Sequence, residues 1–152
     1  MHLPVSLRII GVLLMLFSTA MLPPMILGLL DNDGSSHAFA IAFGINLLAG
    51  LSLWLPTRNA RRDLRIRDGF LVTAMFWIVL GAFGAVPFLT SEALPLSLAD
   101  ALFESVSGLT TTGATVIAGL DDLPRSVLLY RQQLQWLGAV SYTHLTLPTT
   151  PY

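Results

Sequence analysis

Residues 95–116 read PLSLADALFESVSGLTTTGATV and combine a short helix with a segment that disfavours helix. Apolar residues recur at helical spacing up to Leu109, and Ser97 with Asp100 fits a capping box at the helix start. Such a helix, about 12 residues and 18 Å long, is too short to cross a bilayer. Three consecutive threonines follow, which favour extended backbone, and then Gly113, which reaches dihedrals closed to other residues.

The composition around this stretch is that of a membrane protein. The chain has 152 residues, of which 54% are hydrophobic and 11% are charged, with a net charge of −1. An ordinary soluble domain has about 25% charged residues, so these charges are too few to cover a water-exposed surface. The chain has no cysteine, which excludes disulfides and thiol catalysis. The near-zero net charge predicts no nucleic-acid partner.

Three stretches without a charged residue precede the short helix, at residues 9–30, 34–57 and 69–91. Each has the length of about 20 residues that a membrane-spanning helix needs. We expect the second span to begin near Ala38, and Pro23 and Pro24 to kink the first. A signal peptide is the alternative for the first stretch, but its apolar core would be shorter, about 7–15 residues.

The distribution of arginine predicts the orientation. The loop 58–68 holds five arginines, whereas the loop around Asp31 and Asp33 holds none. Positive charge is retained on the cytoplasmic side, so the loop 58–68 is predicted to be cytoplasmic in a multi-pass protein. The third span then runs outward and ends near Glu92, and the short helix after it is either re-entrant or on the external surface.

The threonine–glycine segment is the candidate site. Non-helical polar backbone is tolerated at membrane depth where it lines a water-filled path, and its oxygens can replace the water around a dehydrated cation. The short helix would direct the negative end of its dipole to the same point. As a bare string, TTTG is also typical of a surface turn. Asp100 and Glu104, four residues apart, are predicted to form an acidic external funnel for cations. No catalytic base or nucleophile accompanies them, so no enzyme is expected.

Three motifs resemble the TrkH/KtrB family, the membrane subunits of bacterial potassium-uptake systems. They are RDGFLV at 67–72, ALFESVSGLTTTGAT at 101–115 and YRQQLQWLG at 130–138. The resemblance covers residues 1–138 in one register. It implies an all-α membrane protein of potassium-channel-like fold, in which four outer helix–pore loop–inner helix repeats surround one filter.

The resemblance also implies a domain organisation. An N-terminal two-helix transmembrane hairpin (1–57) and the arginine-rich loop (58–68) precede the first, incomplete pore repeat (69–140), with its re-entrant loop and truncated inner helix. The implied filter consists of Thr110, Thr111, Thr112 and Gly113, where Thr111 and Thr112 bind potassium through backbone oxygens. Potassium is the transported ion, and no cofactor is implied.

The implied surroundings are the lipid bilayer of the bacterial inner membrane, a second copy in a homodimer, and TrkA, a cytosolic nucleotide-binding subunit. Residues 141–152, SYTHLTLPTTPY, depart from the family pattern and resemble translated sequencing-adapter read-through. We expect them to be non-native and unable to extend a membrane helix. With one filter segment of four, the chain alone is expected not to conduct. The alternative function is a small non-conducting membrane interaction or assembly protein.

Overall fold

The computed structural model describes residues 3–59 and 66–146, and every regular element in these ranges is helical. This confirms the predicted all-α class. The elements are α1 (Leu3–Thr19), α2 (Leu22–Asp31), α3 (Ser36–Thr57), α4 (Ile66–Gly84), α5 (Val86–Thr90), α6 (Leu98–Leu109), the 3-10 turn η1 (Leu120–Asp122) and α7 (Arg125–Thr146).

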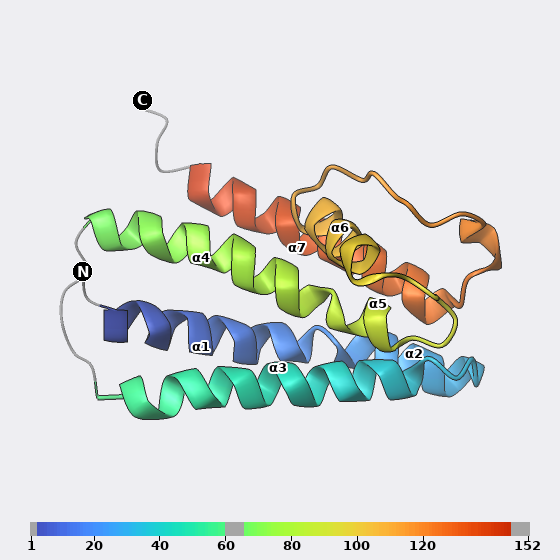
Figure 1. The fold of residues 1–152 in the computed structure, drawn as a ribbon, viewed down its shortest axis with the longest axis horizontal. Helices are drawn as coiled ribbons and strands as arrows, with labels where there is room; N and C mark the ends of the chain where they lie inside the picture. Colours follow the sequence, from blue (N-terminus) through green and yellow to red (C-terminus); the bar gives the residue numbers. More distant parts are fainter. Residues whose placement is uncertain (1–2, 60–65, 147–152) are drawn as a thin grey trace.

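The long helices run side by side along the long axis of the molecule (Figure 1). α1 packs between α3 and α4, while the short α6 packs against α4 and α7. The start of α1, the end of α3 and the start of α4 lie at one end of the bundle. The turn between α2 and α3 and the segments on either side of α6 lie towards the other end (Figure 1).

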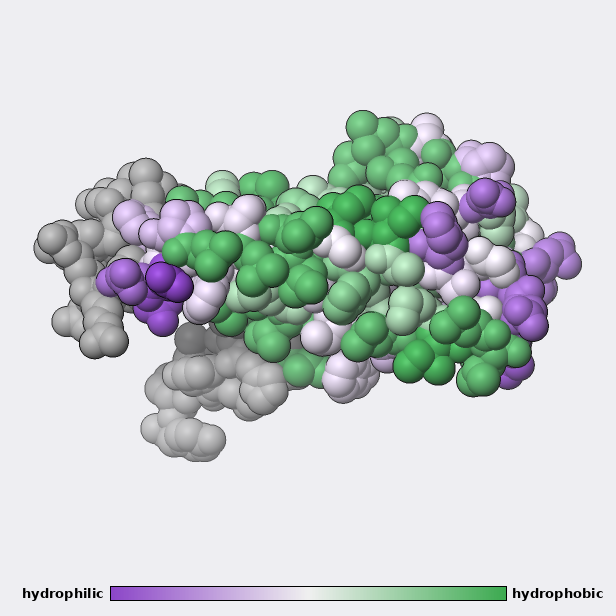
Figure 2. Space-filling view, turned by 90° about the horizontal axis from the view of Figure 1, so that it is seen from below, coloured by the Kyte–Doolittle hydropathy of each residue, from purple (hydrophilic) through white to green (hydrophobic). Residues whose placement is uncertain are grey.

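Three helical stretches are long and apolar enough to cross a membrane: Pro4–Asp31, Ser36–Thr57 and Val72–Thr90. They coincide with the three predicted spans. On the face shown in Figure 2, hydrophobic side chains cover the middle of the long axis and hydrophilic ones gather towards its ends. A bilayer normal along this axis therefore matches the surface to its surroundings.

Proline places the breaks in two of these stretches. The first turns at Ala20 and Met21 and resumes as α2, in which Pro23 and Pro24 are the second and third residues. The third breaks at Ala85, just before Pro87 in α5. Proline lacks an N–H, which the first turn of a helix does not need, so each helix restarts there without losing a hydrogen bond. The kink predicted at Pro23 and Pro24 is confirmed.

Glycine allows α1 and α3 to approach closely. A Cβ atom on Gly11 would lie 2.8 Å from the Gly50 carbonyl oxygen, and one on Gly50 would lie 2.8 Å from the Gly11 carbonyl oxygen. A Cβ atom on Gly81 of α4 would likewise lie 3.0 Å from the Cγ2 of Val106 of α6. By contrast, a Cβ on Gly44 of α3 would meet nothing within 4 Å. Small residues therefore mark close packing at only some of their positions.

A buried tyrosine joins the N-terminal helices to α7. The Tyr130 ring lies 5.5 Å from Phe39 of α3 and 5.2 Å from Phe88 of α5, measured between ring centroids. Its hydroxyl donates a hydrogen bond of 2.8 Å to the Gly84 carbonyl at the end of α4. The polar end of the ring thus has a partner, and its apolar body fills the core.

One predicted boundary differs from the structure. α3 begins at Ser36 rather than near Ala38, because the turn is completed within residues 32–35. The last helix, α7, begins after Pro124, whose carbonyl accepts hydrogen bonds from the N–H groups of Val127 and Leu128. α7 continues through residues 141–146 to Thr146. It is not among the described helices that are long and apolar enough to cross a membrane, so the prediction that residues 141–152 cannot extend a membrane helix stays a prediction. Serine and threonine are tolerated in helices, and the first proline of this stretch is Pro148. Residues 60–65 of the predicted cytoplasmic loop lie outside the described residues.

Candidate functional site: the segment after α6

α6 starts at the predicted capping box. The Ser97 hydroxyl accepts a hydrogen bond of 3.2 Å from the Asp100 N–H, and the Asp100 carboxylate accepts one of 3.3 Å from the Ser97 N–H. Asp100 therefore satisfies the exposed start of the helix. It fixes where α6 begins and, through the helix length, where the threonine segment follows.

α6 ends in a Schellman turn that includes the candidate filter. The Thr112 N–H donates to the Ser107 carbonyl at 3.0 Å, and the Thr111 N–H donates to the Gly108 carbonyl at 3.0 Å. This motif places one residue in the left-handed region, a position that glycine usually occupies. Here Thr111 occupies it, with φ 58°.

The backbone therefore differs from the extended segment expected from three β-branched residues. Residues 110 and 111 form a turn, and residues 112–117 are neither helix nor strand. A β-branched residue at positive φ is strained by about 1–3 kcal/mol, and such strain is typical of functional sites. Gly113, at φ 74°, also uses a backbone conformation that a side chain would oppose.

The hydrogen bonds of this segment leave its carbonyl groups available. The N–H groups of residues 110–113 all donate to carbonyls near the end of α6, at distances from 2.8 to 3.4 Å. Within the described ranges, no hydrogen bond is accepted by the carbonyl oxygens of Thr111, Thr112 and Gly113, whereas the Thr110 carbonyl accepts the Thr111 hydroxyl at 2.7 Å. Three successive carbonyls are thus free to contact a cation.

The threonine hydroxyls are mostly engaged within the segment. The Thr110 hydroxyl lies 2.8 Å from the Thr112 hydroxyl and donates to the Val106 carbonyl at 2.8 Å. Residues 110–116 are all exposed, and a Cβ on Gly113 would meet nothing within 4 Å. The segment is therefore open to its surroundings, and its three free carbonyls are too few to replace a hydration shell.

The acidic funnel predicted from Asp100 and Glu104 is wrong, because Glu104 points into the protein. Glu104 is buried, with 2% of its surface exposed. Its carboxylate accepts hydrogen bonds from the Thr115 hydroxyl, the Val116 N–H and the Arg131 Nε. A sequence signal existed. Glu104 is spaced three and four residues from two small buried residues of α6, and Arg131 is the sole charge within residues 126–140. Two isolated opposite charges in apolar helices are expected to pair.

A polar contact that the sequence did not reveal fastens α7 to the turn before α3. The Asp33 carboxylate accepts hydrogen bonds from the Ser35 N–H at 2.9 Å and the Ser126 hydroxyl at 2.6 Å. Ser35 and Ser126 also share a short hydroxyl contact. Desolvation raises the pKa of Asp33, but the hydrogen bonds from Ser126 and Ser35 outweigh it and lower that pKa below 3.8. Arg125 adds an exposed ion pair with Asp31 at 3.6 Å.

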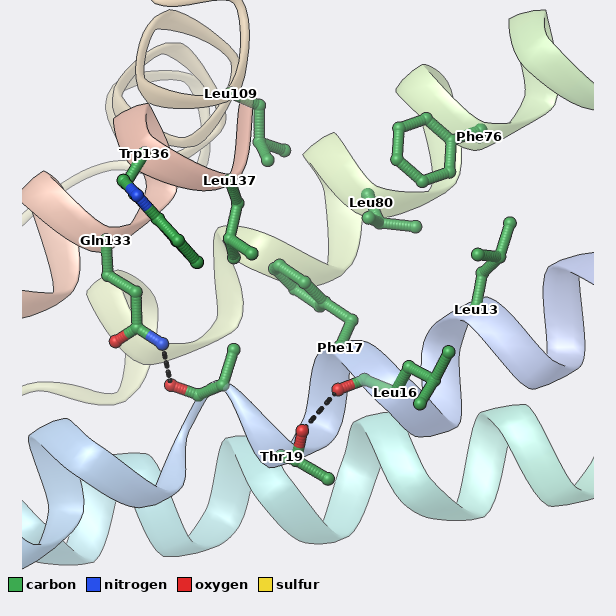
Figure 3. A pocket seen from close by; sticks show the side chains of 11 residues that line it. Leu13, Leu16, Phe17, Thr19, Phe76, Leu80, Leu109, Gln133, Trp136 and Leu137 are labelled. Atoms are coloured by element: carbon green, nitrogen blue, oxygen red, sulfur yellow. Dashed lines mark hydrogen bonds between the residues drawn. The ribbon is translucent and has the colours of Figure 1, made fainter. Parts of the chain in front are cut away.

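A concave site away from the threonine segment is apolar. A cavity of about 360 Å³ lies between α1, α4 and α7, with side chains such as Phe17, Leu80 and Leu137 on its walls (Figure 3). Its main polar feature is Gln133, which donates to the Ala20 carbonyl at the α1–α2 break at 2.9 Å. Among the described residues, no group of three or more His, Cys, Asp or Glu could hold a metal. The apolar side chains and Gln133 do not form a set of catalytic groups.

The fold and the site define a multi-pass, all-α membrane protein with a short helix that ends in a turn of free carbonyls. The chain belongs to the TrkH family of cation transport proteins, whose family model matches residues 35–151. This confirms the resemblance inferred from the three motifs.

Individual relatives are similar over nearly the whole chain. The Trk system potassium uptake protein TrkH of Halomonas elongata is 53% identical over 151 residues, and that of Escherichia coli K12 is 46% identical over 151 residues. The crystal structure of the potassium transporter TrkH from Vibrio parahaemolyticus superimposes with a TM-score of 0.93 at 46% identity, covering 97% of this chain and 32% of that one. The chain spans about 31% of the length of the two relatives. The non-native origin of residues 141–152 stays a prediction.

Proposed function

We propose that this chain supplies one segment of a potassium-selective filter in a potassium-uptake protein of the bacterial inner membrane. The observation that carries the proposal is the set of free carbonyls at Thr111, Thr112 and Gly113. Backbone carbonyls are the ligands that replace the hydration shell of potassium in filters. The name of the relatives, potassium uptake protein, supports the choice of ion.

The exposure of the segment supports a shared filter. Residues 110–116 leave one side open, as expected if further segments complete a ring around the ion. The C-terminal end of α6 places the negative end of a helix dipole beside the same carbonyls, which favours a cation there. The membrane potential then drives cation entry, at about 2.3 kcal/mol per charge per 100 mV.

The proposal includes the surroundings of the complete protein. The relatives are named as parts of a Trk system, which supports a multi-component assembly. The proposed partners are a second copy of the protein and a cytosolic nucleotide-binding subunit, TrkA. The arginine-rich loop 58–68 faces the cytoplasm, on the same side of the membrane as TrkA. The protein acts as a transporter, and its chemistry is ion binding rather than catalysis.

The test joins residues 1–140 to the remaining part of the Vibrio parahaemolyticus relative and expresses this chimera in bacteria that lack their own potassium uptake. We expect the chimera to restore growth at low potassium. Gly113→Ala should abolish uptake, because alanine is strained at φ 74°. Gly44→Ala is the matched control, since a Cβ there meets nothing within 4 Å. Uptake that survives Gly113→Ala would favour the non-conducting assembly protein instead.

A second prediction concerns the chain by itself. Residues 1–140 alone, reconstituted in a bilayer, should give no potassium-selective current, because three carbonyls cannot replace a hydration shell. The measurement is single-channel recording, with the chimera as the positive control. A selective current from the chain alone would contradict the shared filter.

A further inference from the structure

Glu104 and Arg131 form a buried ion pair next to the filter segment. The Arg131 Nε lies 3.0 Å from the Glu104 Oε2, and the two side chains are 8% and 1% exposed. Burying two charges carries a large desolvation cost, and an apolar pair of similar size is often at least as stable. The pair therefore calls for an explanation other than the stability of α6 against α7.

The two oxygens of Glu104 have separate partners. Oε1 accepts both the Thr115 hydroxyl at 2.5 Å and the Val116 N–H at 2.7 Å. Oε2 accepts the Arg131 Nε. Glu104 itself lies on α6. Its carboxylate thus contacts both α7 and the segment that follows Gly113. Thr115 continues this chain of contacts, since its hydroxyl accepts the Ile117 N–H at 3.0 Å.

These contacts hold the far end of the candidate filter. The near end is fixed by the Schellman turn on α6, and Thr115 lies two residues beyond Gly113. The Ser107 hydroxyl also donates to the Ala114 carbonyl at 2.7 Å. Hydrogen bonds to α6 therefore hold the backbone on both sides of the free carbonyls of residues 111–113. On the far side, the acceptor is the charged side chain of Glu104.

We propose that Glu104 is a positioning residue for the filter, which acts through its Oε1 on Thr115 and Val116, and that Arg131 keeps its carboxylate oriented through the hydrogen bond to Oε2. This inference rests on the proposed function. Filters discriminate between cations by the number and placement of carbonyl dipoles, so loosening one end lets the carbonyls close around a smaller ion. Mutation of a residue that orients an ion ligand typically lowers ion affinity or activity by about 10-fold to 100-fold.

Two double variants of the chimera separate the ion pair from the acceptor. Glu104→Gln with Arg131→Met removes both charges but keeps an amide oxygen that can accept from Thr115 and Val116. Glu104→Leu with Arg131→Met removes the same charges and also the acceptor. The readouts are membrane abundance, the preference for potassium over sodium in uptake, and amide hydrogen exchange of residues 114–118.

We expect the Gln/Met variant to retain the potassium preference and the Leu/Met variant to lose about tenfold or more of it at equal abundance. Exchange at Val116 should rise in the Leu/Met variant alone. Equal preference and equal exchange in both variants would overturn the inference, and so would equal losses, which would assign the effect to the ion pair.

Thr115→Val provides a variant of nearly equal shape in case the buried double variants fail to reach the membrane. It removes the hydrogen bond to Oε1 and the one accepted from the Ile117 N–H, while Thr115→Ser retains both. Only the valine variant should lower the potassium preference, and unchanged preference would count against Glu104. The proposed function is tested separately. It is wrong if the chimera without substitutions is present in the membrane but takes up no potassium. In that case the hydrogen-exchange comparison still decides the role of Glu104.

Discussion

At the scale of single residues, the site depends on one threonine in a conformation that threonine disfavours. Thr111 has φ 58°, and its N–H and that of Thr112 close the end of α6. A glycine there would fit the turn without strain. The sequence contains Gly113 two positions later, so residue preference alone would place the turn at the wrong residue.

This strain predicts opposite effects for two neighbouring substitutions. Thr111→Gly should raise the stability of the chimera by roughly 1 kcal/mol, because relief of about 1–3 kcal/mol of strain exceeds the entropic cost of glycine, about 0.5–1 kcal/mol. Thr112→Gly should lower it, since Thr112 does not have positive φ. Thermal unfolding in detergent measures both. A decrease of equal size in the two variants would show that Thr111 carries no strain.

At the scale of elements, sequence patterns located the helices and proline and capping residues located several of their ends. Ser97 and Asp100 start α6 as predicted, and the break before Pro23 is where the ring geometry requires it. Contacts between elements were harder to foresee. The direction of Glu104 depends on Arg131 and Thr115, which lie on other segments, and helical spacing alone does not reveal which neighbours a helix face will meet.

The contact of Asp33 with Ser126 predicts a stability that depends on pH. The pKa of Asp33 is lowered in the folded chain, so its stabilising effect is complete above the unfolded pKa of about 4 and is lost as pH falls through the lower folded value. Ser126→Ala should reduce stability at neutral pH by about 1 kcal/mol and weaken this acid dependence.

Ser52→Ala is the matched control for that prediction, because the Ser52 hydroxyl is exposed and bonds only to the Ala49 carbonyl of its own helix. Thermal unfolding of the chimera at pH 7 and near pH 3.5 provides the measurement. If Ser126→Ala and Ser52→Ala behave alike at both values, the contact between α7 and the turn before α3 contributes nothing to stability.

At the scale of the whole molecule, the bundle is asymmetric along its long axis. One end carries the start of α1, the end of α3 and the start of α4, and the turn with Asp33 and the segments around α6 lie towards the other end (Figure 1). The five arginines of the loop 58–68 predict that the first end faces the cytoplasm, because positive charge is retained there. The sequence could predict this asymmetry, whereas the proposed ring around the ion could not be built from one segment.

The absence of cysteine allows the orientation to be tested with single introduced thiols. Glu92 and Asn59 are both exposed; Asn59 follows the end of α3, and Glu92 follows the end of the third span. In intact cells expressing the chimera with a cysteine-free remainder, a membrane-impermeant maleimide should label Glu92→Cys and leave Asn59→Cys unlabelled until the cells are opened. The reverse pattern would place the arginine-rich loop outside and would contradict the orientation predicted from the arginines.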